Sequence, residues 1–73
     1  MIKRYIFHYD ESFPDNKEVY EKDGMSANDI LKAHDGMECS AEDIGGMNAN
    51  SSVEIFFDDG NEFTAFVYEL EEV

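Results

Sequence analysis

The hydrophobic pattern near the N-terminus predicts a β-hairpin. In an extended segment over residues 2–9, the odd-numbered residues fall on one face and the even-numbered residues on the other, and both faces carry apolar side chains, which is typical of a central strand. Residues 12–16 contain a proline followed by Asp and Asn, which favours a turn. Residues 17–22 then offer a second short strand, so we expect the two segments to pair.

A single main helix is predicted between residues 26 and 36. Ser26 and Asp29 form a capping box, in which each side chain can accept a hydrogen bond from the backbone amide of the other residue. Apolar residues then recur at helical spacing, and these are Ala27, Ile30, Leu31 and His34. Gly36 follows at the position where a left-handed residue commonly ends a helix.

A second capping box, Ser40-Ala41-Glu42-Asp43, predicts a short helical turn after the main helix. Gly45 and Gly46 follow almost directly and would stop such a helix within about one turn. The stretch 45–52 is small and polar, which is typical of an exposed loop.

The C-terminal third of the chain predicts a second hairpin. Strands are expected over residues 53–57 and 62–70, because an Asp59-Gly60 turn between alternating β-branched and aromatic residues is a strong hairpin signal. Two registers are open, since a shift of one residue turns a whole strand over. The odd-numbered residues of the first strand share a face either with even-numbered residues of the second or with its odd-numbered residues. The latter register gives the more uniformly apolar face and is favoured.

This order of elements predicts an α+β fold in a single domain, residues 1–73. With hairpins at both ends of the chain, the expected architecture is a four-stranded antiparallel sheet in ββαββ order. One main helix packs on one face of this sheet through Ile30 and Leu31, and a short second helical turn follows it.

Size and composition agree with a folded domain. A chain of 73 residues is long enough for one core, and 42% hydrophobic residues, including six Phe and four Tyr, argue against disorder. Cys39 is the only cysteine, so no disulfide can form within the chain, which fits a reducing compartment. No segment has the apolar run of a signal peptide or the ~20 apolar residues of a membrane span. We therefore expect a soluble, cytoplasmic protein.

Charge changes this ordinary picture. Eighteen Asp and Glu residues against five Lys and Arg residues give a formal net charge of −13. Residues 1–32 hold all five cations and seven acids, whereas residues 33–73 hold eleven acids and no Lys or Arg. The second half of the chain is therefore acidic throughout.

Candidate catalytic and metal-ligating residues are few. Cys39 would need activation by His34, but an acidic neighbour such as Glu38 favours a raised thiol pKa. His34 and Cys39 supply two ligands where structural zinc needs four, and the turn 58–61 lacks the oxygen spacing of a calcium loop. So short a chain has little room for a cleft that would shift the pKa of a catalytic carboxylate. We expect no enzyme, metal site or cofactor, and the lack of a basic stripe argues against direct nucleic-acid binding.

The acidic surface is the strongest functional feature. The net charge exceeds the magnitude of ~2–8 that serves the solubility of a small domain, and the excess costs stability through self-repulsion. Carboxylates two residues apart on a strand lie about 6.6 Å from each other on one face, so residues 54–62 could form a row of charge that residues 69–72 extend. We expect this row to bind a basic protein partner and not a membrane. The candidate partner-binding residues are Asp35, Glu38, Glu42, Asp43, Glu54, Asp58, Asp59, Glu62, Glu69, Glu71 and Glu72.

In size, expected element order and acid-only second half, with tip residues such as Asp58, Asp59 and Glu62, the chain resembles the small phage-encoded anti-CRISPR proteins and other DNA mimics. The resemblance covers the whole chain and rests on no diagnostic motif. It implies an inhibitor of anti-CRISPR or anti-restriction type that occupies the DNA- or PAM-binding surface of a nuclease complex in the host-cell cytoplasm. Two alternatives stay open: an immunity protein or antitoxin that neutralises a basic toxin, and a small acidic domain whose charge has no electrostatic role.

Overall fold

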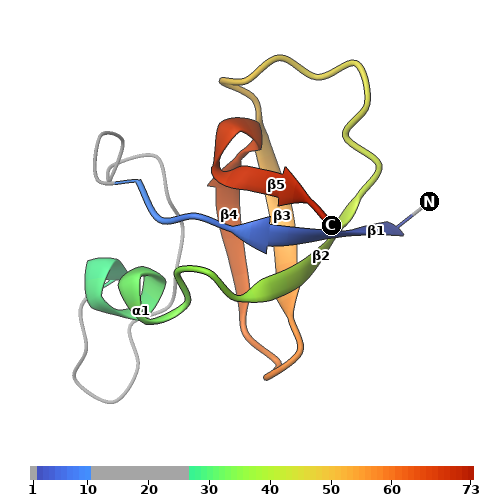
Figure 1. Cartoon of the computed structure of the whole chain (residues 1–73). Coiled ribbons are helices and arrows are strands. Elements are labelled where there is room, and N and C mark those ends of the chain that lie inside the picture. The colour runs from blue at the N-terminus through green and yellow to red at the C-terminus, as the bar shows by residue number, and fades with distance from the viewer. Residues whose placement is uncertain (1, 11–26) are drawn as a thin grey trace.

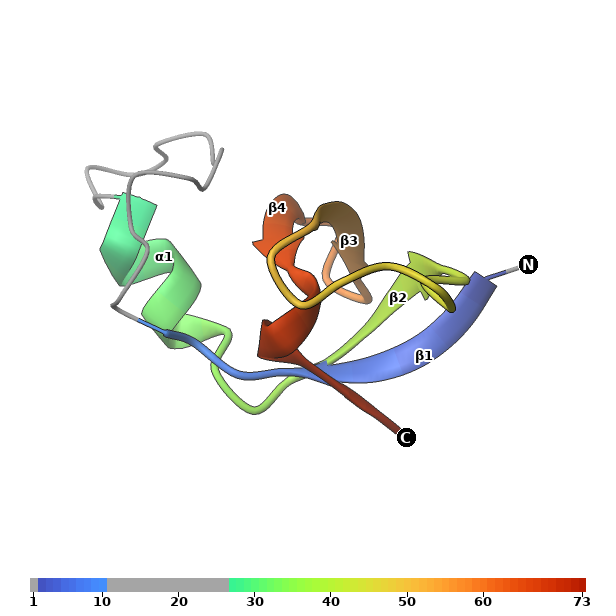
Figure 2. The same ribbon diagram turned by 90° about the horizontal axis from the view of Figure 1, so that it is seen from above.

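The computed structural model describes residues 2–10 and 27–73, which form five strands and two short helices. In chain order these elements are β1 (Ile2–Phe7), α1 (Ala27–Ala33), β2 (Glu38–Glu42), β3 (Ser52–Phe57), β4 (Glu62–Phe66), a 3₁₀ helix (Val67–Glu69) and β5 (Leu70–Glu72). The strands form one sheet in the order β4-β3-β2-β1-β5, and every neighbouring pair is antiparallel. The sheet curves strongly and forms a half-barrel (Figure 1 and Figure 2).

This architecture contradicts the prediction of a four-stranded ββαββ sheet with a main helix on one face. The expected strand at residues 17–22 lies outside the described residues. Two differences change the topology: the segment expected as a second helical turn is a strand, and the long strand expected over residues 62–70 is two strands. The α-helix is also short, at seven residues, and lies to the side of the curved sheet (Figure 2).

The strand β2 lies in the middle of the sheet, where the sequence predicted a helical turn. Its residues alternate, because Cys39 and Ala41 are fully buried whereas Glu38 and Glu42 are exposed. Capping signals are local, and here they are outweighed by backbone pairing with β1 along one edge and with β3 along the other. Because the two buried side chains are small, the alternation is a weak hydrophobic signal in the sequence.

The 3₁₀ helix divides the C-terminal segment into two strands at opposite edges of the sheet. After β4 ends at Phe66, the chain turns and β5 pairs with β1. The Glu69 side chain is buried, and its Oε1 accepts a hydrogen bond from the backbone amide of Phe66 over 3.0 Å. This bond fixes the turn, so the prediction of one continuous strand is wrong.

The hairpin of β3 and β4 confirms the favoured register. Ile55 lies opposite Phe63 and Val53 opposite Ala65, so the odd-numbered residues of both strands share the buried face. In the loop, Gly60 adopts φ +92°, a left-handed conformation that glycine reaches without steric cost. The alternative register is wrong.

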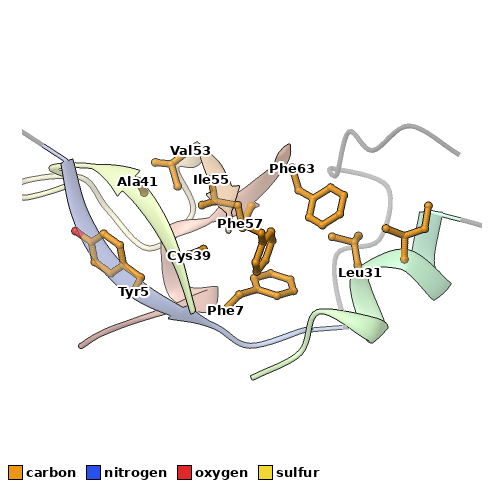
Figure 3. Packing of buried hydrophobic residues seen from close by; sticks show 11 residues of the cluster. Tyr5, Phe7, Leu31, Cys39, Ala41, Val53, Ile55, Phe57 and Phe63 are labelled. Atoms are coloured by element: carbon orange, nitrogen blue, oxygen red, sulfur yellow. The ribbon is translucent and has the colours of Figure 1, made fainter. Parts of the chain in front are cut away.

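The core fills the concave side of the sheet, and α1 closes one end of it. Leu31 of the helix points toward the rings of Phe7, Phe57 and Phe63 (Figure 3). The Phe57 ring meets the Phe7 ring at a centroid distance of 5.9 Å and the Phe63 ring at 5.4 Å, both edge to face, which is a favoured aromatic geometry. Ile30 is buried as well, so the apolar stripe of the helix is confirmed at these two residues.

The end of α1 also follows the prediction. Gly36 has φ +82°, and its amide donates a hydrogen bond to the Phe7 carbonyl over 2.7 Å. The turn after the helix is thereby tied to the strand β1. Within the described residues, no helix has the length and apolar content needed to cross a lipid bilayer.

Candidate protein-binding surface

The convex face of the sheet carries most of the strand-borne acids. Odd-numbered residues of β2, β3 and β4 point into the core, so the even-numbered residues lie on the opposite face, where all but the buried Phe66 at the end of β4 are at least partly exposed. The predicted partner-binding residues that lie on this face are Glu38, Glu42, Glu54, Glu62 and Glu71. They share the face with Arg4, Ser40 and Phe56, so it is not uniformly acidic.

Two pairs of carboxylates lie across the neighbouring strands β2 and β3. The ladder between these strands covers three residues of each. Continued by one residue at either end, the same register sets Glu38 opposite Asp58 and Glu42 opposite Glu54. Side chains that face each other across two strands lie about 5 Å apart at Cβ, so each pair brings two negative charges together.

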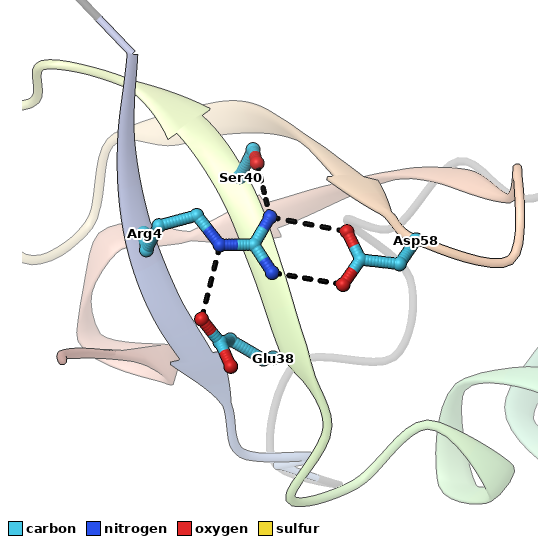
Figure 4. A network of polar contacts seen from close by, with 4 residues as sticks. All are labelled: Arg4, Glu38, Ser40 and Asp58. Atoms are coloured by element: carbon cyan, nitrogen blue, oxygen red, sulfur yellow. Dashed lines mark hydrogen bonds and ion pairs between the residues drawn. The ribbon is translucent and has the colours of Figure 1, made fainter.

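Arg4 of β1 binds both carboxylates of the first pair and offsets one of their two negative charges. The Arg4 guanidinium donates two hydrogen bonds to the Asp58 carboxylate, at 3.1 and 2.9 Å, and its Nε donates to Glu38 over 3.0 Å. It also donates to the Ser40 hydroxyl (Figure 4). The bonds to Asp58 and then to Glu38 raise the pKa of Arg4. We call these four residues the Arg4 cluster.

The second pair borders a shallow apolar groove of about 360 Å³. We call it the Phe56 groove, and its lining consists of Glu42, Ile44, Met47, Ser52, Val53, Glu54 and Phe56. Met47 is 49% exposed and Phe56 37% exposed, although both are large apolar side chains. The groove therefore combines accessible apolar surface with two carboxylates in its lining.

On the convex face, Phe56 lies between a neutral and an acidic neighbour. Ser40 of the Arg4 cluster is opposite it on β2, and Glu62 is opposite it on β4. Glu54 lies two residues along the same face of β3. Within the described chain, neither Glu54 nor Glu62 forms an ion pair. An exposed aromatic ring is thus set among carboxylates, and aromatic side chains often anchor protein interfaces.

Lys3, also on β1, pairs with two further predicted acids. Its Nζ lies 3.3 Å from Glu72 and 3.8 Å from Asp43. The hydrogen bond to Glu72 raises the pKa of Lys3, whereas the Gly45 amide and then Lys3 lower the pKa of Asp43. Together with Arg4, this places cations of the N-terminal strand among acids of the second half, so the charge asymmetry along the chain is partly cancelled in space.

Two more of the predicted partner-binding acids form contacts away from the Arg4 cluster and the Phe56 groove. Glu71 Oε1 lies 3.2 Å from His8 Nε2 at the β5 edge. The Asp35 carboxylate accepts a hydrogen bond from the backbone amide of Tyr9 over 2.9 Å. Both carboxylates are exposed, but neither adjoins the Phe56 groove.

Asp59 joins the β3–β4 turn to the end of α1. Its Oδ2 lies 2.8 Å from His34 Nε2, and His34 Nδ1 lies 2.8 Å from the Ile30 carbonyl. The imidazole packs on the rings of Phe57 and Phe63 at centroid distances of 4.6 and 5.0 Å. The Asn61 amide is the main cause that lowers the pKa of Asp59, and His34 adds to it. As predicted, His34 is a helix-end residue that completes the apolar stripe.

Glu69 and Cys39 are both removed from the surface. The Glu69 side chain is buried beneath the 3₁₀ helix, so it does not extend a surface row of charge as the sequence predicted. Cys39 is fully buried in the core, and this burial raises the pKa of its thiol to about 11. Among the described residues, no three His, Cys, Asp or Glu side chains lie close enough together to hold a metal ion.

Sequence reasoning missed the apolar part of this surface and the role of Arg4. A signal for the first was present, because a strand that buries Ile55 and Phe57 must turn Phe56 outward. Ile44 and Met47 come from the loop after β2, and their approach to Phe56 depends on that strand. Arg4 and Asp58 are 54 residues apart, and no local pattern connects them.

Comparisons with protein-family models, with curated proteins and with solved structures found no match to this chain.

Proposed function

We propose that the chain is a binding protein, not an enzyme, that presents convex-face carboxylates to the basic surface of a nucleic-acid-binding protein. By occupying that surface it would exclude nucleic acid, as an inhibitor of anti-CRISPR or anti-restriction type does. The observation that carries the proposal is the position of Glu54 and Glu62, which flank the exposed Phe56 and form no ion pair with any other residue that the structure describes. Like charges on adjacent strands cost stability, so a role in binding accounts for their position.

The amount of charge supports competition with DNA. The described residues include thirteen acids and three Lys or Arg residues, a net charge of −10, and the long axis of the molecule is 36 Å. B-DNA of this length carries roughly 21 phosphate charges. The protein therefore reaches about half the linear charge of DNA, which is enough to direct it to the same basic surfaces.

The Arg4 cluster narrows the binding surface within this face. Its two carboxylates already accept hydrogen bonds from an intramolecular guanidinium, which offsets one of their two negative charges. The carboxylates of Glu54 and Glu62, on β3 and β4, form no ion pair with another described residue. We therefore assign the partner-binding surface to these strands and to the loop before β3.

The proposal is tested by capture from lysate of the source cells with bead-bound protein, followed by elution with duplex DNA. We expect nucleic-acid-binding proteins to be captured, released by DNA and released by salt. The variant Glu54→Lys/Glu62→Lys should lose this capture. A matched control, Asp29→Lys/Glu71→Lys, makes the same change in net charge away from β3 and β4 and should retain it.

Three results would contradict the proposal. Equal loss in both variants would mean that only net charge matters and that no particular surface binds. Capture of one basic toxin, with no release by DNA, would instead favour the immunity-protein or antitoxin alternative. Absence of any salt-sensitive partner would leave the charge without an electrostatic role.

A further inference from the structure

We propose that the Phe56 groove receives an arginine side chain of the partner. This inference rests on the proposed function, because it assigns one subsite of the same surface. The overall charge of the protein does not determine which side chain the partner inserts or where, and the groove assigns both.

The Arg4 cluster shows how this face binds a guanidinium. Glu38 and Asp58 lie opposite each other one residue beyond one end of the β2–β3 ladder, and Arg4 reaches both carboxylates. Glu42 and Glu54 have the same relation at the other end of the ladder and line the groove. The geometry that holds the intramolecular arginine is therefore repeated at the groove, where Glu54 has no ion pair within the described chain.

The apolar lining suits the rest of an arginine side chain. Ile44 and Met47 can cover its aliphatic stem, while the planar guanidinium can stack on the exposed ring of Phe56. Met47 is unbranched and adapts its shape to a bound group. A groove of about 360 Å³ is at the lower end of the range for ligand pockets, which fits a single side chain better than a larger ligand.

Other occupants fit less well. A purely apolar side chain would cover the Glu54 carboxylate without giving it a hydrogen-bond donor, and burial of an unpaired charge is costly. Lysine has a compact, strongly hydrated ammonium, whereas the planar guanidinium can donate to the Glu54 carboxylate and stack on the Phe56 ring at the same time. Arginine is therefore the occupant that suits both the Glu54 carboxylate and the aromatic ring.

The test is an NMR titration of the full chain with the blocked tripeptide Gly-Arg-Gly. All Ile and Met methyl groups are labelled, so that those of Ile44 and Met47 report on the groove and the others on the rest of the chain. Matched tripeptides carry lysine or norleucine in the middle position. We expect saturable shifts of both methyl groups with the arginine peptide, weaker binding of the lysine peptide and no saturable shift with norleucine. Glu54→Gln should weaken arginine binding by about three- to fivefold, as expected for an exposed ion pair.

Two further variants keep the test decisive. Met47→Ser lies in a loop and should weaken arginine binding without affecting the fold, whereas Glu38→Gln, in the Arg4 cluster, should leave it unchanged. Equal binding of lysine and arginine, saturable binding of norleucine, or shifts spread over all carboxylate-bearing segments would each overturn the inference.

The tripeptide titration and the capture experiment distinguish failure of the arginine subsite from failure of the proposed function. If DNA-sensitive capture depends on Glu54 and Glu62 but the tripeptides do not bind the groove, the arginine subsite is wrong and the proposed function stands. If the arginine peptide binds but no nucleic-acid-binding protein is captured, the proposed function is wrong and the groove remains an arginine site for another partner.

Discussion

The Arg4 cluster and the Phe56 groove lie on the same face of the same two strands, yet their carboxylates differ in what they contact. In the cluster, Glu38 and Asp58 hold a guanidinium from the neighbouring strand. In the groove, Glu54 faces solvent beside an exposed aromatic ring. The comparison teaches that acids of one surface can divide into a set that stabilises the fold and a set that costs stability, and only the second set is available to a partner.

The largest effect is expected from removing the cation of the cluster. Arg4→Gln should lower the midpoint of thermal unfolding by several degrees, because Glu38 and Asp58 would then repel each other across β2 and β3. Lys3→Gln is the matched control on the same strand. Lys3 makes one contact to each of its two acids, and both contacts are longer than those of Arg4. Its replacement should therefore lower the unfolding midpoint less. Thermal unfolding followed by circular dichroism measures both, and a larger loss in Lys3→Gln would contradict the role of the cluster.

Replacing one glutamate in each region should show that the two regions contribute differently to the free energy of unfolding. Glu38→Gln should destabilise the protein, because it removes an acceptor of Arg4. Glu54→Gln should leave the free energy of unfolding unchanged or raise it by up to about 1 kcal/mol, because it removes a negative charge opposite Glu42. Urea denaturation of both variants checks this. Equal destabilisation by the two changes would mean that the groove carboxylate is structural as well.

The smallest effect is expected at the β3–β4 turn, where Asp58 belongs to the cluster and Asp59 to the helix contact. The pKa of Asp59 is lowered in the folded protein, so its stabilising effect is complete above the unfolded value of about 3.9 and is lost as the pH falls below it. Asp59→Asn should therefore be less stable at neutral pH and lose less stability on acidification. Urea denaturation between neutral and acidic pH tests this, and parallel curves for the two proteins would contradict it.

Part of the fold could be predicted from the sequence because the relevant signals are local. The β3–β4 hairpin and its register follow from a turn glycine between strands with one strongly apolar face, as Ile55 and Phe63 show. The helix α1 ends as predicted because Gly36 can adopt a positive φ. In both cases residues close in sequence contain the whole signal.

The candidate site was only partly predictable. The acidic character of residues 33–73 pointed to carboxylates on a surface, and Glu54 and Glu62 lie on one. Asp58 and Glu69 were expected on the same surface row, but one binds Arg4 and the other is buried. Charge counted along a chain does not show which carboxylates find a donor after folding.

The sequence by itself determined the net charge, the apolar alternation of β3 and β4, and the conformations that its turn glycines allow. Tertiary structure alone decided that residues 38–42 form the middle strand, that the chain breaks after Phe66 so that β5 reaches β1, and that Arg4 meets Asp58. The physical reason is that each of these outcomes depends on backbone or side-chain partners distant in sequence. Their hydrogen bonds, once the chain closes on itself, outweigh the local preferences that favour a helical turn or one unbroken strand.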